Sequence, residues 1–186
     1  MTSKTIILVA IGSNSIGHWG SPQQSLARAI EELNFVFNGN TKVSCLHTSR
    51  AVGGVRQPDY WNAVIRIEGN IPPARFLMFL KRLEREAGRK GAVGTRWGPR
   101  PLDLDIIDCG HRVNGWYAPR HALRPSRRPD FLILPHPQAH LRRFVLQPLL
   151  EVEPYWRHPA LCTPGQTLLR RLPNGVAVPR PKRGRA

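Results

Sequence analysis

The sequence predicts an α+β fold whose elements follow one another in the order β-α-β-β-α-β, with an antiparallel sheet and helices on one face of it. Two observations support this prediction. Four short β-branched, apolar runs have the character of strands, and two longer segments repeat apolar residues at helical spacing. In addition, a chain of 186 residues with 41% apolar content is long enough to bury a core of its own.

The first half of the predicted core is a strand, a helix and a second strand. Residues 5–11 form an apolar run that closes at a Gly-Ser-Asn turn. Ser21 is suited to cap the helix, because Pro22 takes the first helical position and Gln24 lies three residues after the cap. The buried stripe of this helix is expected to contain Leu26, Ile30, Leu33 and Phe37. Residues 41–49 follow as the second strand.

The second half of the core is a strand, a helix and a last strand. Residues 60–68 alternate, and one face of this strand should hold Trp61, Ala63, Ile65 and Ile67. A helix is expected from Pro72 to Gly88, and its buried stripe should contain Phe76, Leu80, Leu83 and Ala87. Residues 102–109 form the fourth strand. This order is that of a ferredoxin-like split β-α-β fold.

The rest of the chain is predicted to be a C-terminal extension of the same domain. A single domain is expected over 1–172, with a basic loop insertion at 111–130, a late helix near 167–172 and a basic, flexible tail at 173–186. No internal repeat or second-domain boundary is visible.

Charge and cysteine content narrow the class of protein. The chain has 28 Lys+Arg against 12 Asp+Glu, and a field of that sign attracts the phosphates of nucleotides or nucleic acids. Its three cysteines are far apart and form no CxxC, which predicts neither a disulfide framework nor a zinc site. No apolar run approaches the roughly 20 residues of a membrane span, and the N-terminal run is too short for a signal peptide. We therefore expect a cytoplasmic protein.

The densest polar segment is RWGPRPLDLDI at 96–106. Asp103 and Asp105 lie two apart on the predicted strand, so both carboxylates project from one face with Cα atoms roughly 7 Å apart. Magnesium can relieve their repulsion, since it favours a few carboxylates together with phosphate oxygens and water. The alternative is a half-exposed strand whose acids pair with Arg96 and Arg100, and the short motif alone favours this alternative.

Three further features are candidates for a ligand site. The Gly-rich loop before the last strand carries Arg89, Arg96 and Arg100, which can order around a polyphosphate. Lys81 and Glu84 either reach a ligand or form an exposed salt bridge. Tyr60 and Asn62 face away from the core, where they suit a flat heterocycle or ordinary cross-strand packing. No Walker A, GxSxG, HExxH or protein-kinase motif is present.

The chain resembles the 6-hydroxymethyl-7,8-dihydropterin pyrophosphokinases from Ala10 to about Leu172. The matching blocks are AIGSN (10–14), QPDYWNAV (57–64), RLEREAGR (82–89), RWGPRPLDLDI (96–106), LPHP (134–137) and RFVLQPLLEV (143–152). The fourth block is highly specific to that family. The resemblance implies transfer of pyrophosphate from ATP to the hydroxymethyl group of the dihydropterin, giving the pterin diphosphate and AMP in tetrahydrofolate synthesis.

The resemblance also implies roles for individual residues. Two magnesium ions would be bound by Asp103 and Asp105, and the transferring phosphates would be steadied by Arg89 and Arg100. ATP would be contacted by Lys81, Glu84, Trp97, Arg100, Ile106, His136 and Arg142. The pterin pocket would consist of Ser49, Val52, Tyr60, Asn62, Trp97 and Phe144, with the ring held between Tyr60 and Phe144.

Three other functions stay open at the level of sequence. Ser49 and Ala51 replace the Thr and Pro usual in the family's first pocket, so a kinase of a different pterin is one alternative. An RNA-binding module suits the fold and charge, but 41–49 and 102–109 contain no aromatic residue for stacking. A pterin binder without turnover would gain nothing from the acid pair. We expect small-molecule substrates, no nucleic-acid or membrane partner, and a monomer.

Overall fold

The computed structural model describes residues 4–51, 56–89, 98–117, 124–125 and 132–173. The elements of the predicted core are β1 (Thr5–Ser13), α1 (Pro22–Val36), β2 (Thr41–Val43), β3 (His47–Ser49), β4 (Tyr60–Gly69), α2 (Pro73–Glu86) and β5 (Asp103–Cys109). The elements that follow are β6 (Trp116–Tyr117), β7 (Arg124–Pro125), a 3-10 helix (Ala139–Leu141), α3 (Arg143–Val152), β8 (Arg157–His158), β9 (Thr163–Pro164) and α4 (Gly165–Arg171).

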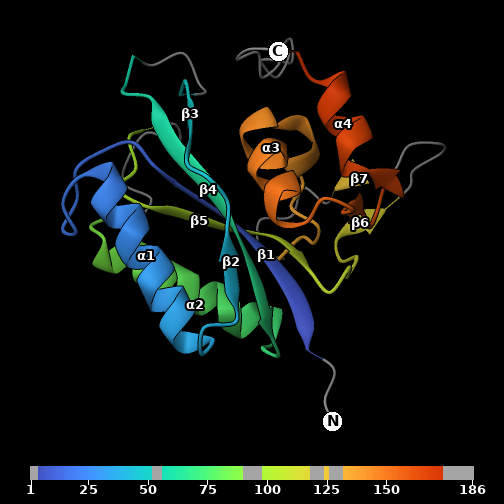
Figure 1. Cartoon of the computed structure of the whole chain (residues 1–186), viewed down its shortest axis with the longest axis horizontal. Coiled ribbons are helices and arrows are strands. Elements are labelled where there is room, and N and C mark those ends of the chain that lie inside the picture. Colours follow the sequence, from blue (N-terminus) through green and yellow to red (C-terminus); the bar gives the residue numbers. More distant parts are fainter. Residues whose placement is uncertain (1–3, 52–55, 90–97, 118–123, 126–131, 174–186) are drawn as a thin grey trace, which may run out of the picture.

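The central sheet has the strand order β2-β4-β1-β5, with β3 also pairing with β4, and all of these pairings are antiparallel. This order is that of the ferredoxin-like fold, and the predicted fold class is confirmed. Helices α1 and α2 lie side by side against one face of the sheet, while α3 lies across the other (Figure 1). The two helices of the predicted core therefore lie on one face as expected, and α3 of the C-terminal extension covers the other face, which the sequence analysis did not predict.

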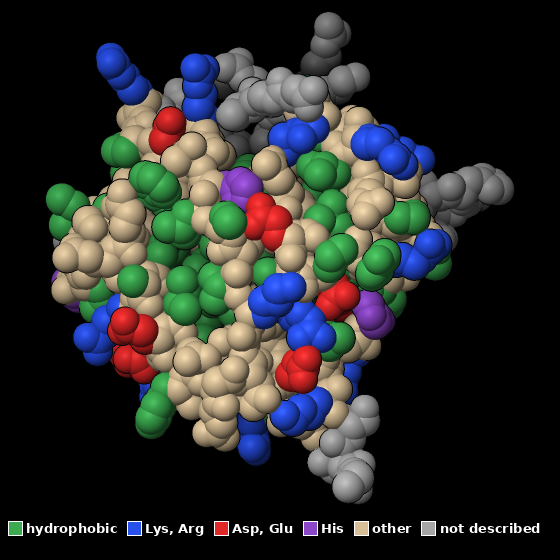
Figure 2. All heavy atoms as spheres, in the orientation of Figure 1, with side chains coloured by type: hydrophobic (Ala, Val, Ile, Leu, Met, Phe, Trp, Pro, Cys, Tyr) green, Lys and Arg blue, Asp and Glu red, His purple; other side chains and the backbone are tan. Residues whose placement is uncertain are grey.

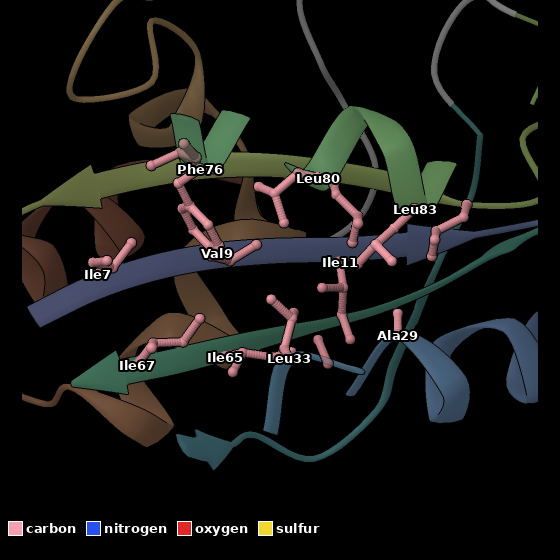
Figure 3. Close-up of a cluster of buried hydrophobic side chains, with 14 of the residues drawn as sticks. Ile7, Val9, Ile11, Ala29, Leu33, Ile65, Ile67, Phe76, Leu80 and Leu83 are labelled. Atoms are coloured by element: carbon pink, nitrogen blue, oxygen red, sulfur yellow. The ribbon is translucent and has the colours of Figure 1, made fainter. Parts of the chain in front are cut away.

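The face of the sheet under α1 and α2 carries the larger hydrophobic core (Figure 3). Ile7, Val9 and Ile11 of β1 are at most 2% exposed and point toward the two helices. The predicted stripe of α2 is fully buried, and Trp61, Ala63, Ile65 and Ile67 of β4 share the same core as predicted. The buried residues of this core are all apolar or cysteine.

The opposite face carries a second core that forms with α3. Leu8, Val64 and Ile107 of the sheet pack there with Leu146 and Leu149 of α3. The sequence reasoning did not predict this helix, because Pro148 lies inside it and a proline removes one helical hydrogen bond. Tertiary packing of the apolar residues around Pro148 compensates for that loss.

Local signals set several boundaries correctly. The Ser21 hydroxyl accepts a hydrogen bond from Gln24 N, and the Gln24 side chain accepts one from Ser21 N, so the predicted capping box is present. Gly88, after α2, has a φ of 98°, which glycine adopts without strain. The predicted late helix is α4.

Two segments differ from expectation. The strand predicted at 41–49 is divided into β2 and β3, because Ser44 Oγ accepts a hydrogen bond from Val64 N and the Cys45 amide turns to Glu151 of α3. The insertion at 111–130 was expected to be a loop, but β6 and β7 pair within it. The tail predicted at 173–186 lies almost entirely outside the described residues. None of the helices in the described ranges has the length and apolarity to span a bilayer.

Candidate active site

A cavity of about 160 Å³ opens where β1 ends and where β4 and β5 begin. Nine of the predicted site residues line it: Ser49, Tyr60, Asn62, Arg100, Asp103, Asp105, His136, Arg142 and Phe144. They come from four separate parts of the chain, which the sheet and the start of α3 bring together.

The floor of the cavity is formed by the smallest residues of β1. In the strand register Gly12 lies between Asn62 and Asp103, and Ala10 lies between Val64 and Asp105. A Cβ atom at Gly12 would lie 3.4 Å from Asn62 Oδ1 and 3.7 Å from Cδ1 of Tyr60. Directly opposite residues share one face of a sheet, so the absence of a side chain at Gly12 keeps that face open. Sequence reasoning found the AIGSN block but gave these two residues no role.

One end of the cavity presents an aromatic ring and an amide. The Asn62 Nδ2 group donates to Ser49 Oγ at 3.0 Å and to the carbonyl oxygens of His47 and Tyr60, both at 3.3 Å. Within the described part of the chain, these acceptors occupy the nitrogen, so the amide oxygen is what Asn62 can offer a ligand. Burial and the charge of Asp103 raise the pKa of Tyr60, which keeps its phenol protonated.

Phe144 lies at the start of α3 and lines the same cavity. The Arg142 guanidinium carbon lies 5.8 Å from the centre of the Phe144 ring. A flat heterocycle that enters the cavity therefore meets aromatic side chains from both the sheet and α3.

The other end of the cavity presents the acid pair. Asp103 Oδ1 is 2.8 Å from Arg89 Nη1 and also pairs with Arg100, the partner that the non-metal alternative assigned to it. Asp105 Oδ2 is 3.8 Å from His136 Nε2. Both carboxylates stay partly exposed, and Leu104 between them points into the apolar core, as the alternation predicted.

The charges around Asp105 favour its ionised form. Burial by itself would raise the pKa of Asp105, but the positive charges of His136, Lys81, Arg142 and Arg100 outweigh it and lower that pKa. Burial also lowers the pKa of His136, and the neighbouring charges of Arg142 and Lys81 add to this effect. His136 lowers the pKa of Asp105 only while it is protonated, whereas Lys81, Arg142 and Arg100 keep their charges, and these charges favour an anionic Asp105 carboxylate.

Four predicted residues lie beside the cavity without lining it. The buried Glu84 carboxylate pairs with Lys81 Nζ at 2.7 Å and with Arg89 Nη1 at 2.6 Å, and it accepts a hydrogen bond from Leu104 N at 2.8 Å. These contacts tie α2 to the outer edge of β5. The side chain of Ile106 belongs to the helix-facing core. Two other predicted residues, Val52 and Trp97, lie outside the described residues.

The fold and the cavity together define a class of protein. An acid pair flanked by arginines suits phosphates and a divalent cation, and an aromatic-amide end suits a flat heterocycle. Since both ends share one cavity, the class is an enzyme that brings a phosphate compound to a heterocyclic substrate.

Comparison with known proteins places the chain within this class. Residues 8–154 match the family model of 7,8-dihydro-6-hydroxymethylpterin-pyrophosphokinase (HPPK), and the chain belongs to this family. A Haemophilus influenzae 2-amino-4-hydroxy-6-hydroxymethyldihydropteridine pyrophosphokinase is 34% identical over 145 residues, which are 77% of this chain and 79% of that protein. The enzyme of the same name from Aquifex aeolicus is 31% identical over 153 residues, covering 82% and 83% of the two chains.

Solved structures agree with the fold. An HPPK-DHPS crystal structure in complex with substrates superposes with a TM-score of 0.61 at 10% identity, over 91% of this chain and 43% of that one. Wild-type Plasmodium falciparum HPPK-DHPS with pteroate gives 0.59 at 11% identity, over 92% and 43%. The chain thus spans less than half of these HPPK-DHPS chains.

Proposed function

We propose that the protein transfers the pyrophosphoryl group of ATP to the hydroxymethyl group of 6-hydroxymethyl-7,8-dihydropterin, with the pterin diphosphate and AMP as products. The observation that carries this proposal is the single cavity that joins the Asp103–Asp105 pair to the Tyr60–Asn62 end. Membership of the HPPK family and the pyrophosphokinase names of its relatives support the same reaction.

The residues present fit magnesium. Asp105 is anionic and partly exposed, and Asp103 engages its arginines through Oδ1. No cluster of three His, Cys, Asp or Glu side chains suited to a metal occurs among the described residues. Magnesium is usually held by one or two carboxylates plus substrate phosphates and water, so this pair is a suitable donor set. We infer that Asp103 and Asp105 hold two ions, which when bound neutralise phosphate charge and acidify the substrate hydroxyl.

In the proposed reaction the pterin hydroxymethyl oxygen bonds to the β-phosphorus of ATP. The bond from that phosphorus to the oxygen bridging the α- and β-phosphates breaks, AMP leaves with the bridging oxygen, and the hydroxyl proton passes to water. The chain contributes mainly alignment and charge, which is what phosphoryl transfer requires.

The two ends of the cavity divide this work. Tyr60 and Phe144 would sandwich the ring, and the Asn62 amide oxygen would accept a hydrogen bond from its edge. Arg89 and Arg100 would move their charge from Asp103 toward the phosphates, while His136 and Arg142 would contact the nucleotide. The proposed ATP contacts of Lys81 and Glu84 would come from α2, and that of Ile106 from β5. Val52 and Trp97 complete the proposed contacts.

On the face of the molecule that Figure 2 shows, the described residues form no basic surface suited to RNA. On the face shown in Figure 2, Lys and Arg side chains are spread around the surface and interspersed with acidic ones. A nucleic-acid site needs basic residues gathered into a patch or stripe. We keep the cytoplasmic location and the monomeric state as predictions from the sequence.

The proposal is tested by measuring AMP formation from ATP and magnesium with and without 6-hydroxymethyl-7,8-dihydropterin. We expect AMP only when the pterin is present, and its loss in a folded Asp105→Ala variant. A well-folded wild-type protein that binds ATP but forms no AMP with this pterin would contradict the proposed reaction.

A further inference from the structure

We propose that Asn14 is a positioning residue. It holds the end of the cavity with Tyr60 and Asn62 at a fixed distance from the end with the Asp103–Asp105 pair. Asn14 follows β1 directly and does not itself line the cavity. Only the identity of the two ligands in this inference rests on the proposed function. The link that Asn14 makes is a matter of geometry.

The Asn14 side chain joins two loops that are distant in sequence. Its Nδ2 group donates to Gln57 Oε1 at 3.0 Å and to the Pro58 carbonyl at 3.1 Å. Its Oδ1 atom accepts a hydrogen bond from Arg100 N at 2.7 Å. One planar amide therefore connects the loop before Tyr60 to the loop before Asp103.

A second set of bonds fixes the same junction on the phosphate side. Asn14 N donates to the Arg100 carbonyl at 3.0 Å, and Ser13 Oγ donates to the Pro101 carbonyl at 2.6 Å. Ser13 and Asn14 are 0% and 1% exposed. In a buried site these bonds do not compete with water, so breaking one leaves a polar group unsatisfied.

The position of these loops connects Asn14 to the reacting groups. Pro58 lies two residues before Tyr60, and Arg100 itself lines the cavity and pairs with Asp103. A shift of either loop changes the separation between the aromatic end and the acid pair. Since phosphoryl transfer depends on alignment, a small shift reduces both binding and turnover.

Two substitutions of Asn14 test its hydrogen bonds to the loop before Tyr60 and to the loop before Asp103 separately. Asn14→Asp keeps an acceptor for Arg100 N but loses both donated bonds. The Gln57 amide can rotate to compensate, but the Pro58 carbonyl cannot. Asn14→Ala loses the side-chain bonds on both sides. The control is Trp156→Phe, which removes a buried hydrogen bond to Asp108 (2.9 Å) in the second core, away from the cavity lining.

The experiment measures two dissociation constants and the melting temperature of each variant. The probes are the dihydropterin and α,β-methylene-ATP, whose α–β bridge cannot be cleaved. We expect Asn14→Asp to weaken pterin binding about tenfold while the nucleotide analogue changes by less than about threefold. Asn14→Ala should weaken both ligands by about fivefold or more. Trp156→Phe should lower the melting temperature without changing either constant.

Three results would overturn the inference: both constants within twofold of wild type in both Asn14 variants, equal loss of both ligands in Asn14→Asp, or the same losses in Trp156→Phe at equal melting temperature. If Asn14→Asp does not fold, Gln57→Ala removes one partner instead of the buried amide and should weaken the pterin alone. Wild-type protein that binds both probes but forms no AMP would refute the proposed reaction and leave the positioning role standing.

Discussion

The two faces of the central sheet differ in composition although the same strands build both. Toward α1 and α2, β1, β4 and β5 present Ile11, Ala63 and Leu104, all nearly inaccessible to solvent. Toward α3 and the cavity, the adjacent positions are Gly12 and Asn62, with the acid pair on β5. The first face stabilises the fold, and the second, which also packs on α3, is the one that we propose binds the ligands. Because side chains alternate along a strand, adjacent residues such as Ile11 and Gly12 face opposite sides of the sheet.

The largest expected effect concerns the polar face. Asp103→Asn should reduce AMP formation by about a hundred- to a thousandfold, because it removes a charge that anchors Arg89 and Arg100 and is proposed to hold magnesium. The measurement is the steady-state rate with saturating ATP and pterin.

Asp108→Asn is the matched control for this substitution. Asp108 lies on the same strand but accepts a hydrogen bond from Trp156 in the second core, and burial raises its pKa. Its replacement should leave the rate within about threefold of wild type, since it touches neither end of the cavity. If both variants lost the same share of the wild-type rate, any change in β5 would stop activity. That result would contradict the idea that only the cavity end of β5 takes part in the reaction.

A substitution on the apolar face should lower the stability of the protein and leave the reaction rate unchanged. Leu80→Ala on α2 removes a fully buried side chain and should lower the free energy of unfolding by about 2–5 kcal/mol. Urea denaturation measures the stability. The rate per folded molecule should be unchanged, since Leu80 points into the helix-side core whereas α2 approaches the cavity through Lys81 and Glu84. A loss of rate at full folding would show that the two faces are not independent.

The apolar face could be predicted from the sequence and much of the polar face could not. The stripe of α2 and the alternation of β4 follow from periodicity, because apolar burial has a geometric signature. Asn14 and Gly12 have no such signature. Their roles come from the register of β1 against β4 and β5 and from loops that meet only in the folded chain. Helix α3 was missed because Pro148 opposes local helix propensity, which tertiary packing overrides.

The residues of the candidate site also could be predicted from the sequence only in part. Asp103 and Asp105 were found from their spacing, and the family resemblance assigned the remaining roles. The contacts of Glu84 with three protein groups could not be predicted, because they depend on how α2 lies along the edge of β5. Arg50 lines the cavity, and no pattern distinguished it from the other arginines of this basic chain.

A smaller effect is expected from filling the floor of the cavity. A Cβ at Gly12 meets Asn62 Oδ1 at 3.4 Å, which is ordinary contact, so Gly12→Ala should fold normally. The added methyl group occupies space where the pterin is proposed to lie and should weaken pterin binding by about tenfold. Binding of α,β-methylene-ATP is the internal control and should change little. Unchanged pterin affinity would place the heterocycle elsewhere in the cavity.

The smallest effect concerns the acid sensitivity of the second core. His158 is fully buried among Trp116, His140 and Trp156, with ring centres 5.1–5.7 Å away, and burial and the charge of His140 lower its pKa to about 4. The unfolded chain binds a proton at this histidine near its ordinary pKa of 6.5, whereas the folded chain does not until about pH 4. Stability from the neutral imidazole is therefore complete above pH 6.5 and falls as the pH drops toward 4.

Urea denaturation between pH 7 and pH 5 tests this titration. We expect the wild-type free energy of unfolding to fall by about 1–2 kcal/mol more than that of His158→Gln, which cannot take up the proton. His158 is the one buried histidine among the described residues and it packs on Trp156 of the second core, so this loss of stability at low pH should come from the α3 side. If the free energy of unfolding fell equally with pH in wild type and His158→Gln, protonation of His158 would not be the cause of any acid sensitivity on the α3 side.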